Sequence, residues 1–358
     1  MKKFFVSLIA ICLSAAFLTG CTPASDIIPA TTTEKTGILL PEIDGEASSF
    51  GDYAVCSESF SFYMGEYYYF FLTILKSTAD ELENSYGVDL GKSLKEQYVG
   101  NSTEKTWFDV IRDETLDYMK TLLFVYEKAI ASNGNYKKIA EEYLNGVVIP
   151  RLRQESGGKP SEYINELYGG TVVYQNYLNA MYIEYIYSCY LENAVTGKID
   201  SLTPEEVSAH ADTLGGNKNE TPVRKAICVR VPEGKNKANT FIEGFNAGGE
   251  KTADALKSLS NSANYEYFTD SFTQGEANKN EISQWLYDSG RSVGDIGAVE
   301  IKNDAYYAVF YIEDGEAEYL YEARLDLALT RATEEIKSGA ASYSGFKADM
   351  EKLNSVNA

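Results

Sequence analysis

The sequence predicts an α+β protein: a mainly helical N-terminal lobe, a small inserted antiparallel-sheet domain, and a C-terminal helical segment that completes the lobe. Three observations support this prediction. Apolar residues recur at helical spacing from about residue 60 to 193, strand-like alternation begins at residue 223, and helical spacing returns after residue 317. Because runs of helices flank a short run of strands, a separate small domain is favoured over a continuous βαβ arrangement.

Residues 1–20 have the pattern of a secretory signal peptide. Lys2 and Lys3 precede a mostly apolar run that ends near Phe17, which is too short for a good membrane span. Cys21 follows Leu-Thr-Gly directly, an arrangement that resembles the lipobox of bacterial lipoproteins, in which this cysteine carries the lipid. We therefore expect an N-terminal lipid anchor on the extracytoplasmic face of the cell membrane. The alternative is an ordinary secretory signal with a chance cysteine.

Residues 21–50 are predicted to form a flexible tether, because small polar residues and prolines replace any apolar period. Removal of residues 1–20 leaves 358 − 20 = 338 residues, enough for two domains with real cores. It also removes two lysines, so the formal charge moves from −21 to −23. A surface this acidic repels nucleic acid, which we exclude as a partner.

The cysteines and the histidine do not suggest a metal site or a cofactor. Cys56, Cys189 and Cys228 remain after Cys21, and they leave open one disulfide plus a free thiol or three small buried side chains. His210 is the only histidine, so a multi-histidine metal site is excluded by count. No phosphate-binding loop, dinucleotide-binding or EF-hand spacing is present.

The helical lobe is expected to span residues 53–215. A central helix is predicted over 60–77 with Ser59 as its N-cap, and further helices over 103–132, 136–154 and 171–193. The predicted apolar stripe of the second helix consists of Trp107, Ile111, Met119, Leu122, Tyr126 and Ile130. That of the last helix consists of Tyr174, Leu178, Met181, Tyr185 and Cys189.

Tyrosine is concentrated in this lobe, with eight residues between Tyr163 and Tyr190 and five between Tyr53 and Tyr69. One interpretation is an adaptable aromatic surface for unfolded peptides or glycans. The other is a helical core with hydroxyl groups at its rim. The helical spacing favours the core.

The inserted domain is expected to span residues 221–316. It follows a short helix that opens with the capping box at 203–206. A strand is predicted at 223–231, helices at 236–246 and 249–260, and a hairpin that turns at Asn303-Asp304. Residues 317–338 and 343–354 return to helix. We expect them to pack on the helices of 60–193, because Leu320, Leu327 and Ile336 form an apolar stripe.

Four short pieces, in this order, resemble the extracytoplasmic foldases of the SurA/PrsA type. They are "SESFSFYMGEYYYF", "LYGGTVVYQNYL", "LTPEEVSAHAD" and "ISQWLYDSGRSVGDIGAVEIKNDAYYAVFYIED". The resemblance covers most of the chain from about residue 53. It implies a chaperone-like helical lobe, whose first helix follows a short strand, and an inserted parvulin-like prolyl isomerase domain.

The departures from this family concern its catalytic groups. Active parvulins usually pair a histidine in the first strand with one in the last. Here the first position falls on Ala226, Ile227 or Cys228 and the second on Tyr306 or Tyr307. The family's Gly-Gly-Asp-Leu-Gly stretch is also replaced. The resemblance therefore implies a degenerate site.

An apolar wall remains where the resemblance places the peptide pocket. The candidate peptide-binding residues are Cys228, Trp285, Leu286, Tyr287, Tyr306 and Tyr307. Cys228 is either a polar pocket group or a core residue, and Trp285 lines either a groove or the domain's own core.

The expected function is a membrane-anchored extracytoplasmic chaperone that binds unfolded or newly exported polypeptides and needs no cofactor. An active prolyl isomerase is the first alternative. Isomerisation crosses a barrier of about 18–20 kcal/mol and needs little acid-base chemistry. A solute- or surface-binding lipoprotein is the second alternative. Solute-binding folds need repeated βα units, and only one short α/β stretch is present.

Overall fold

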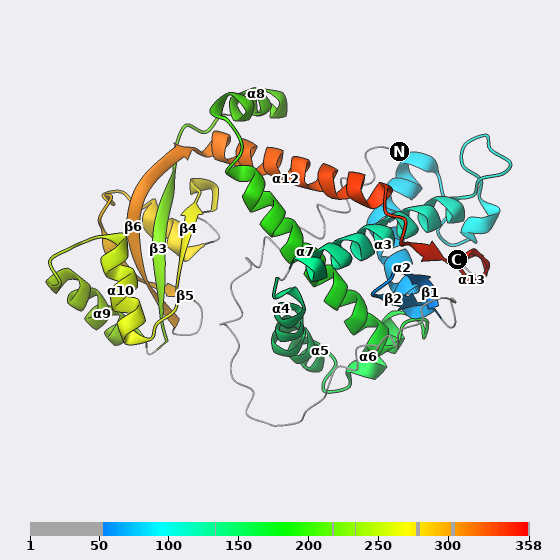
Figure 1. Cartoon of the computed structure of the whole chain (residues 1–358), viewed down its shortest axis with the longest axis horizontal. Coiled ribbons are helices and arrows are strands. Elements are labelled where there is room, and N and C mark those ends of the chain that lie inside the picture. Colours follow the sequence, from blue (N-terminus) through cyan, green and yellow to red (C-terminus); the bar gives the residue numbers. More distant parts are fainter. Residues whose placement is uncertain are drawn as a thin grey trace. The chain divides into compact units, whose positions relative to one another are not determined.

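The computed structural model describes residues 53–132, 134–216, 218–232, 234–276, 280–301 and 305–356 (Figure 1). The predicted signal peptide, Cys21 and the tether lie outside the described residues. The chain is mostly helical with two small antiparallel sheets, so the predicted α+β class is confirmed. None of the described helices is long and apolar enough to cross a membrane.

Backbone contacts divide the chain into two compact units. The helical unit contains the described residues up to Thr196 together with those from Arg331 onward, and the sheet unit contains Gly197–Thr330. Both junctions lie inside helices, one in α7 (Tyr174–Ile199) and one in α12 (Glu318–Ala341). Sequence analysis placed the corresponding boundaries elsewhere, in the segment between residues 215 and 221 and at the end of the last strand, between residues 316 and 317.

The helical unit begins with a small sheet rather than a helix. Strands β1 (Tyr53–Cys56), β2 (Ser61–Tyr63) and β7 (Lys347–Ala348) pair antiparallel in the order β2-β1-β7. Helix α2 (Met64–Tyr86) therefore starts later than residue 60, and Ser59 does not cap it. Instead Ser59 Oγ donates to Glu127 Oε2 at 2.8 Å, and Glu66 accepts from the Tyr63 amide at 2.9 Å at the true helix start. The early start was wrong because the alternating segment 61–63 pairs with β1.

Helix α3 (Trp107–Ala131) lies against α2 and follows a 3-10 turn, η2 (Leu94–Glu96). Its predicted stripe is buried except for Ile130, which is 37% exposed near the helix end. Helices α4 (Tyr136–Tyr143) and α5 (Ile149–Glu155) are joined without a break by a π-helical turn, η3 (Leu144–Val148). Pro150 sits in the first turn of α5, where a missing N–H group is tolerated.

Helix α7 follows α6 (Pro160–Leu167) and buries a different face from the predicted one. Of the predicted stripe only Leu178 is buried, and the other four side chains are partly exposed. The buried set is Leu178, Asn179, Ala180, Tyr182, Ile183, Ile186, Tyr187, Leu191 and Val195. Apolar residues surround this helix, so periodicity alone could not select the buried face. The unit ends with the second half of α12, strand β7 and a short helix α13 (Met350–Asn354), where sequence analysis expected continuous helix from 343.

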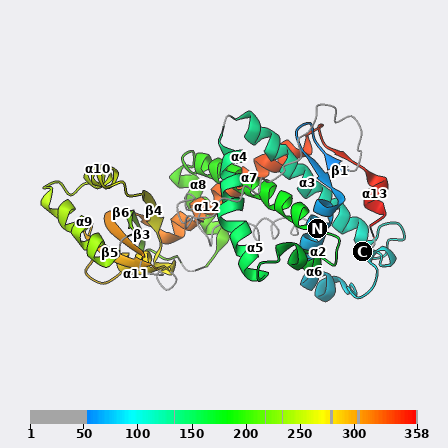
Figure 2. The same cartoon turned by 90° about the horizontal axis from the view of Figure 1, so that it is seen from below.

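The sheet unit has one four-stranded antiparallel sheet in the order β4-β3-β6-β5. Strands β3 (Pro222–Val231), β5 (Ile296–Ile301) and β6 (Ala305–Ala317) match the predicted segments, whereas β4 (Tyr267–Phe272) was not predicted. Helices α9 (Lys235–Ala247) and α10 (Ala253–Ala263) cover one face, and α11 (Glu281–Leu286) lies on the other (Figure 2). A 3-10 turn, η4 (Gln274–Glu276), links β4 to the segment before α11.

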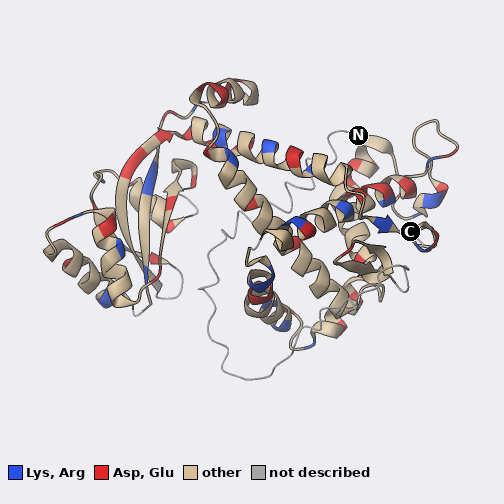
Figure 3. Cartoon of the chain, viewed as in Figure 1, with Lys and Arg blue, Asp and Glu red and all other residues tan. Residues whose placement is uncertain are grey.

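Helix α8 (Pro204–Leu214) precedes this sheet and begins with the predicted capping box, in which Thr203 Oγ1 accepts from the Glu206 amide at 3.2 Å. The first turn of α12 is joined to the sheet unit through Glu318. Its carboxylate accepts from the amides of Gln274 and Gly275, both at 3.1 Å. Acidic residues are spread over both units (Figure 3), and Glu313, Asp314 and Glu316 lie near the C-terminal end of β6.

Candidate functional site

The two faces of the four-stranded sheet bury different side chains. The register pairs Cys228 with Val309, and pairs Ile227 with Phe310. Alternation therefore places Cys228 and Val309 in the cluster under α11, and Ile227 and Phe310 in the cluster under α9 and α10. The predicted peptide-binding residues are divided by this alternation.

Cys228 and Leu286 belong to the core and not to a contact surface. Both side chains are fully buried. Burial raises the pKa of the Cys228 thiol well above its ordinary value, and the nearby Asp270 adds to this shift. Of the two interpretations of Cys228, the structure therefore agrees with a small core residue rather than a polar pocket group. Leu286 packs in the same cluster. Neither can touch a peptide directly in this conformation.

Tyr306 and Tyr307 point to opposite faces because they are neighbours on β6. Tyr306 is buried with Val231 and Ala238, and its hydroxyl donates to Glu300 Oε2 at 2.7 Å. Sequence analysis was therefore wrong to place Tyr306 beside the α11 pocket. Tyr307 is on the α11 face, half-buried, with its ring 5.7 Å from that of Phe268 on β4.

Trp285 lies half-buried on α11, against the same cluster as Tyr307. A glycine makes room for it. A Cβ built at Gly297 on β5 would lie 2.6 Å from the indole ring, closer than side chains tolerate. The guanidinium of Arg291 stacks over the indole with its central carbon 4.4 Å from the ring centroid. The indole is thus partly core and partly surface, which combines the two interpretations of Trp285.

Tyr287 joins α11 to the sheet. Its hydroxyl lies 2.8 Å from the carbonyl oxygens of Pro222 and Phe272 and accepts from the Arg224 amide at 3.2 Å. Burial, the largest cause, raises the pKa of Tyr287 to about 12. The Arg224 guanidinium stacks on the Tyr287 ring at 4.7 Å and donates to the Leu286 carbonyl. Tyr287 therefore has a structural part in holding α11 in place.

The site that remains is an aromatic rim made of Phe268, Trp285 and Tyr307, with Ile301 beside it. Phe268 and Arg291 were missed by sequence reasoning. Phe268 could have been found only by recognising that residues 267–272 form an edge strand. No feature of the sequence pointed to Arg291. The arrangement offers apolar, partly exposed rings and no histidine, because His210 lies on α8 and contacts Asp326 Oδ2 at 2.7 Å. Among the described residues no group of three potential metal ligands was found.

The helical unit carries many more aromatic residues, and two of its tyrosines share a carboxylate partner. Glu184 on α7 accepts from the hydroxyls of Tyr69 at 3.2 Å and Tyr118 at 3.1 Å. Burial raises the pKa of Glu184 to about 7, while the two hydroxyl bonds oppose this rise. The rings of Tyr69 and Tyr177 meet edge to face at 5.6 Å. This cluster is therefore packed core with its hydroxyl groups paired.

No protein-family profile matches the chain, and no curated protein matches it. The solved structures that resemble it include the foldase PrsA of Streptococcus pneumoniae, with 13% identity, a TM-score of 0.26 and coverage of 69% of this chain and 93% of that one. They also include PrsA of Bacillus subtilis, with 14% identity, a TM-score of 0.33, and coverage of 67% and 89%. The peptidylprolyl isomerase PrsA of Bacillus anthracis has 14% identity, a TM-score of 0.22, and coverage of 68% and 99%.

These structures come from the same kind of foldase that the sequence pieces resemble. At identities of 13–14% and TM-scores of 0.22–0.33, this likeness carries no argument about what the chain does.

Proposed function

We propose that this chain is a membrane-anchored extracytoplasmic chaperone that binds unfolded or newly exported polypeptides, with the aromatic rim of the sheet unit as a contact surface. The observation that carries the proposal is the rim itself. Phe268, Trp285 and Tyr307 are half-buried rings on one core cluster, on the face where the family resemblance places a peptide pocket. Partly exposed aromatic rings of this kind are typical anchors for extended peptides.

Binding on this surface would remove apolar client side chains from water without any chemical step. Each large apolar side chain that is buried contributes about 1.5–3 kcal/mol. The acidic surface of the chaperone then keeps the complex soluble, since the chain has a net charge of −21. The Arg291 guanidinium over Trp285 adds a cation at the edge of the rim, suited to a carbonyl or carboxylate of the client.

The rim predicts a specific loss of client protection. In the full-length chain, Trp285→Ala and Tyr307→Ser should each weaken suppression of a model client's aggregation by about tenfold, because hot-spot aromatic residues contribute most of the binding energy. The measurement is light scattering of a chemically denatured client on dilution, over a series of chaperone concentrations.

Tyr267→Ala is the matched control. Tyr267 is next to Phe268 on the same strand, pairs with Val229, and is therefore on the other face of the sheet. Protection should be unchanged in this variant, and circular dichroism should show all variants folded. If the rim variants protect as well as the wild type, the rim is not the client surface. If the full chain also accelerates isomerisation of a proline tetrapeptide, the isomerase alternative gains support.

The anchor is tested separately. Cys21→Ser should release the protein from the membrane fraction or leave its precursor unprocessed, because the lipid can no longer be attached. Fractionation of cells followed by immunoblotting measures this. A variant that is processed and membrane-bound like the wild type would contradict the lipobox interpretation.

A further inference from the structure

A pocket in the helical unit, far along the chain from the aromatic rim, has features of a ligand site. It has a volume of about 360 Å³ and lies between the end of α3, the start of α4 and the middle of α7. Ligand pockets in proteins begin at about this size. Its floor is apolar and buried, formed by Tyr126, Ala129 and Ile186.

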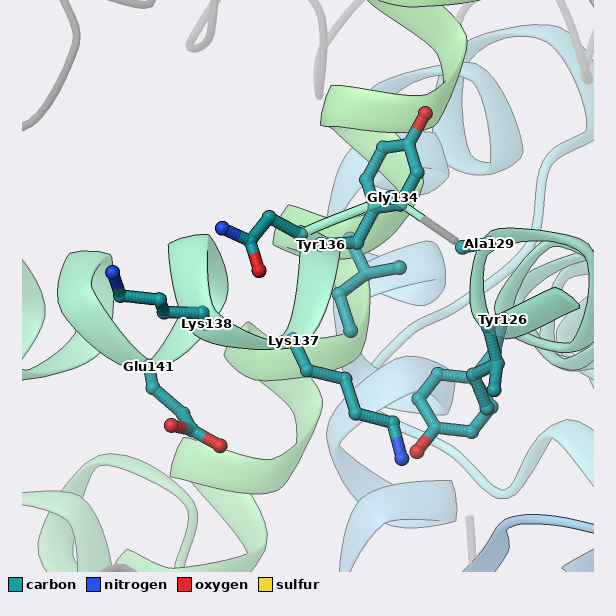
Figure 4. A pocket seen from close by; sticks show the side chains of 10 residues that line it. Tyr126, Ala129, Gly134, Tyr136, Lys137, Lys138 and Glu141 are labelled. Atoms are coloured by element: carbon teal, nitrogen blue, oxygen red, sulfur yellow. The ribbon is translucent and has the colours of Figure 1, made fainter. Parts of the chain in front are cut away.

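Two polar groups at one side of the pocket have no partner among the described residues. The Lys137 ammonium lies 5.6 Å from the centroid of the Tyr126 ring and forms no ion pair there. The Tyr126 hydroxyl forms no hydrogen bond with the described residues. Figure 4 shows Lys137 extending toward Tyr126, while Lys138 and Glu141 lie apart from this pair. Lys138 already has a carboxylate at 3.6 Å, that of Glu142.

A third polar group lies behind the floor. The hydroxyl of Tyr182 is buried, and no described residue bonds to it. Burial, the largest cause, raises the pKa of this hydroxyl, and Tyr126 and Glu141, which both line the pocket, raise it further. A buried hydroxyl without a partner costs free energy.

We infer that this pocket binds a carboxylate carried on an apolar body, with the body on the floor of Tyr126, Ala129 and Ile186 and the carboxylate between the Lys137 ammonium and the Tyr126 hydroxyl. Charge favours an anion here. The chain has 53 acidic and 32 basic residues, and the Lys137 ammonium supplies a positive charge beside this apolar floor. Glu141 also lines the pocket, but its side chain lies apart from Lys137 and Tyr126 (Figure 4).

The same chemistry can come from a free small acid or from the C-terminal residue of a polypeptide, so the test includes both. Calorimetric titration of the full-length chain uses 3-phenylpropionate, a tetrapeptide that ends in phenylalanine, and the same peptide as its C-terminal amide. Tighter binding of the small acid identifies free carboxylates as the ligand class. Tighter binding of the peptide acid, with at least tenfold loss on amidation, identifies chain termini.

Two variants tie binding to the named groups. Lys137→Met retains the aliphatic stem and should weaken carboxylate binding about tenfold, the usual effect of losing one charge-assisted bond. Tyr126→Phe should weaken it by a smaller factor. Lys138→Met is the matched control and should change affinity less than about twofold.

The inference is overturned if neither acid binds the wild type more tightly than about 1 mM. It is also overturned if Lys137→Met binds as well as the wild type. The pocket and the aromatic rim lie in different units, so these titrations and the client-protection assay can fail independently.

Discussion

The helical unit and the sheet unit use aromatic residues in opposite ways. In the helical unit many rings are buried in the core, and the hydroxyl groups of Tyr69 and Tyr118 donate to the Glu184 carboxylate. In the sheet unit one face of the sheet is closed by α9 and α10, whereas the α11 face leaves Phe268, Trp285 and Tyr307 half-buried.

This difference shows that aromatic content does not by itself identify a binding surface. The helical unit has the higher concentration of tyrosine, yet its central rings form core. The sheet unit has fewer rings, but a short helix covers them incompletely. What decides the part that a ring plays is how much of it the neighbouring elements cover.

The largest expected effect compares one ring from each unit. Phe70 is fully buried, with ring contacts to Phe62 at 5.5 Å and Tyr118 at 5.6 Å. Phe70→Ala should therefore lower the free energy of unfolding by about 3–5 kcal/mol. Phe268→Ala, at the half-buried rim, should lower it by about 1 kcal/mol. Urea unfolding followed by far-UV circular dichroism measures both. Equal losses would remove the distinction between core rings and rim rings.

A smaller effect concerns the carboxylate that holds the helical unit's tyrosines. The pKa of Glu184 is raised to about 7, from an ordinary value of 4.5, mainly by burial. The folded chain therefore binds more protons than the unfolded chain between these values. The stabilising contribution of protonated Glu184 is full below about pH 4.5 and is lost as the pH rises through about 7. Glu184→Gln should flatten this part of the stability profile.

The measurement is the melting temperature between pH 4.5 and 8 for wild type and variant. Glu192→Gln, at an exposed position on the same helix, is the control and should follow the wild type. The pKa values of Glu66 and Glu114 are also raised by burial, so some slope should persist in Glu184→Gln. A variant whose slope equals that of the wild type would show that Glu184 does not titrate in this range.

The element types were predictable where the sequence has strong periodicity. The capping box at 203–206, the strand that begins at Pro222 and the β5–β6 hairpin all agree with the sequence. Strand β4 was missed because an edge strand buries little. Only Phe272 among its six residues is buried, so no apolar alternation marks it. Strand β7 has two residues and depends on its pairing with β1, far away in sequence.

The candidate site was predictable in part. Trp285 and Tyr307 lie against one core cluster, whereas their part in peptide binding stays a prediction. Only the strand register shows that Tyr306 is not on this face. A shift of one residue in the pairing would put Tyr306 there in place of Tyr307. The burial of Cys228 and Leu286 required knowledge of which face α11 covers. The pocket beside Lys137 has no sequence motif, although nine of its ten lining residues lie between Tyr126 and Glu141, and folding adds Ile186 of α7.

The position of the unit junctions has a consequence for anyone who wishes to cut this protein into pieces. The chain passes between the helical unit and the sheet unit twice, at Thr196–Gly197 in the last turn of α7 and at Thr330–Arg331 in the middle of α12. A fragment that ends there exposes a helix end with up to four unpaired backbone groups and no capping residue. Loop positions such as Thr203 offer a natural cap, but they leave part of α7 without its neighbours. Fragment boundaries should therefore follow helix caps rather than contact maps.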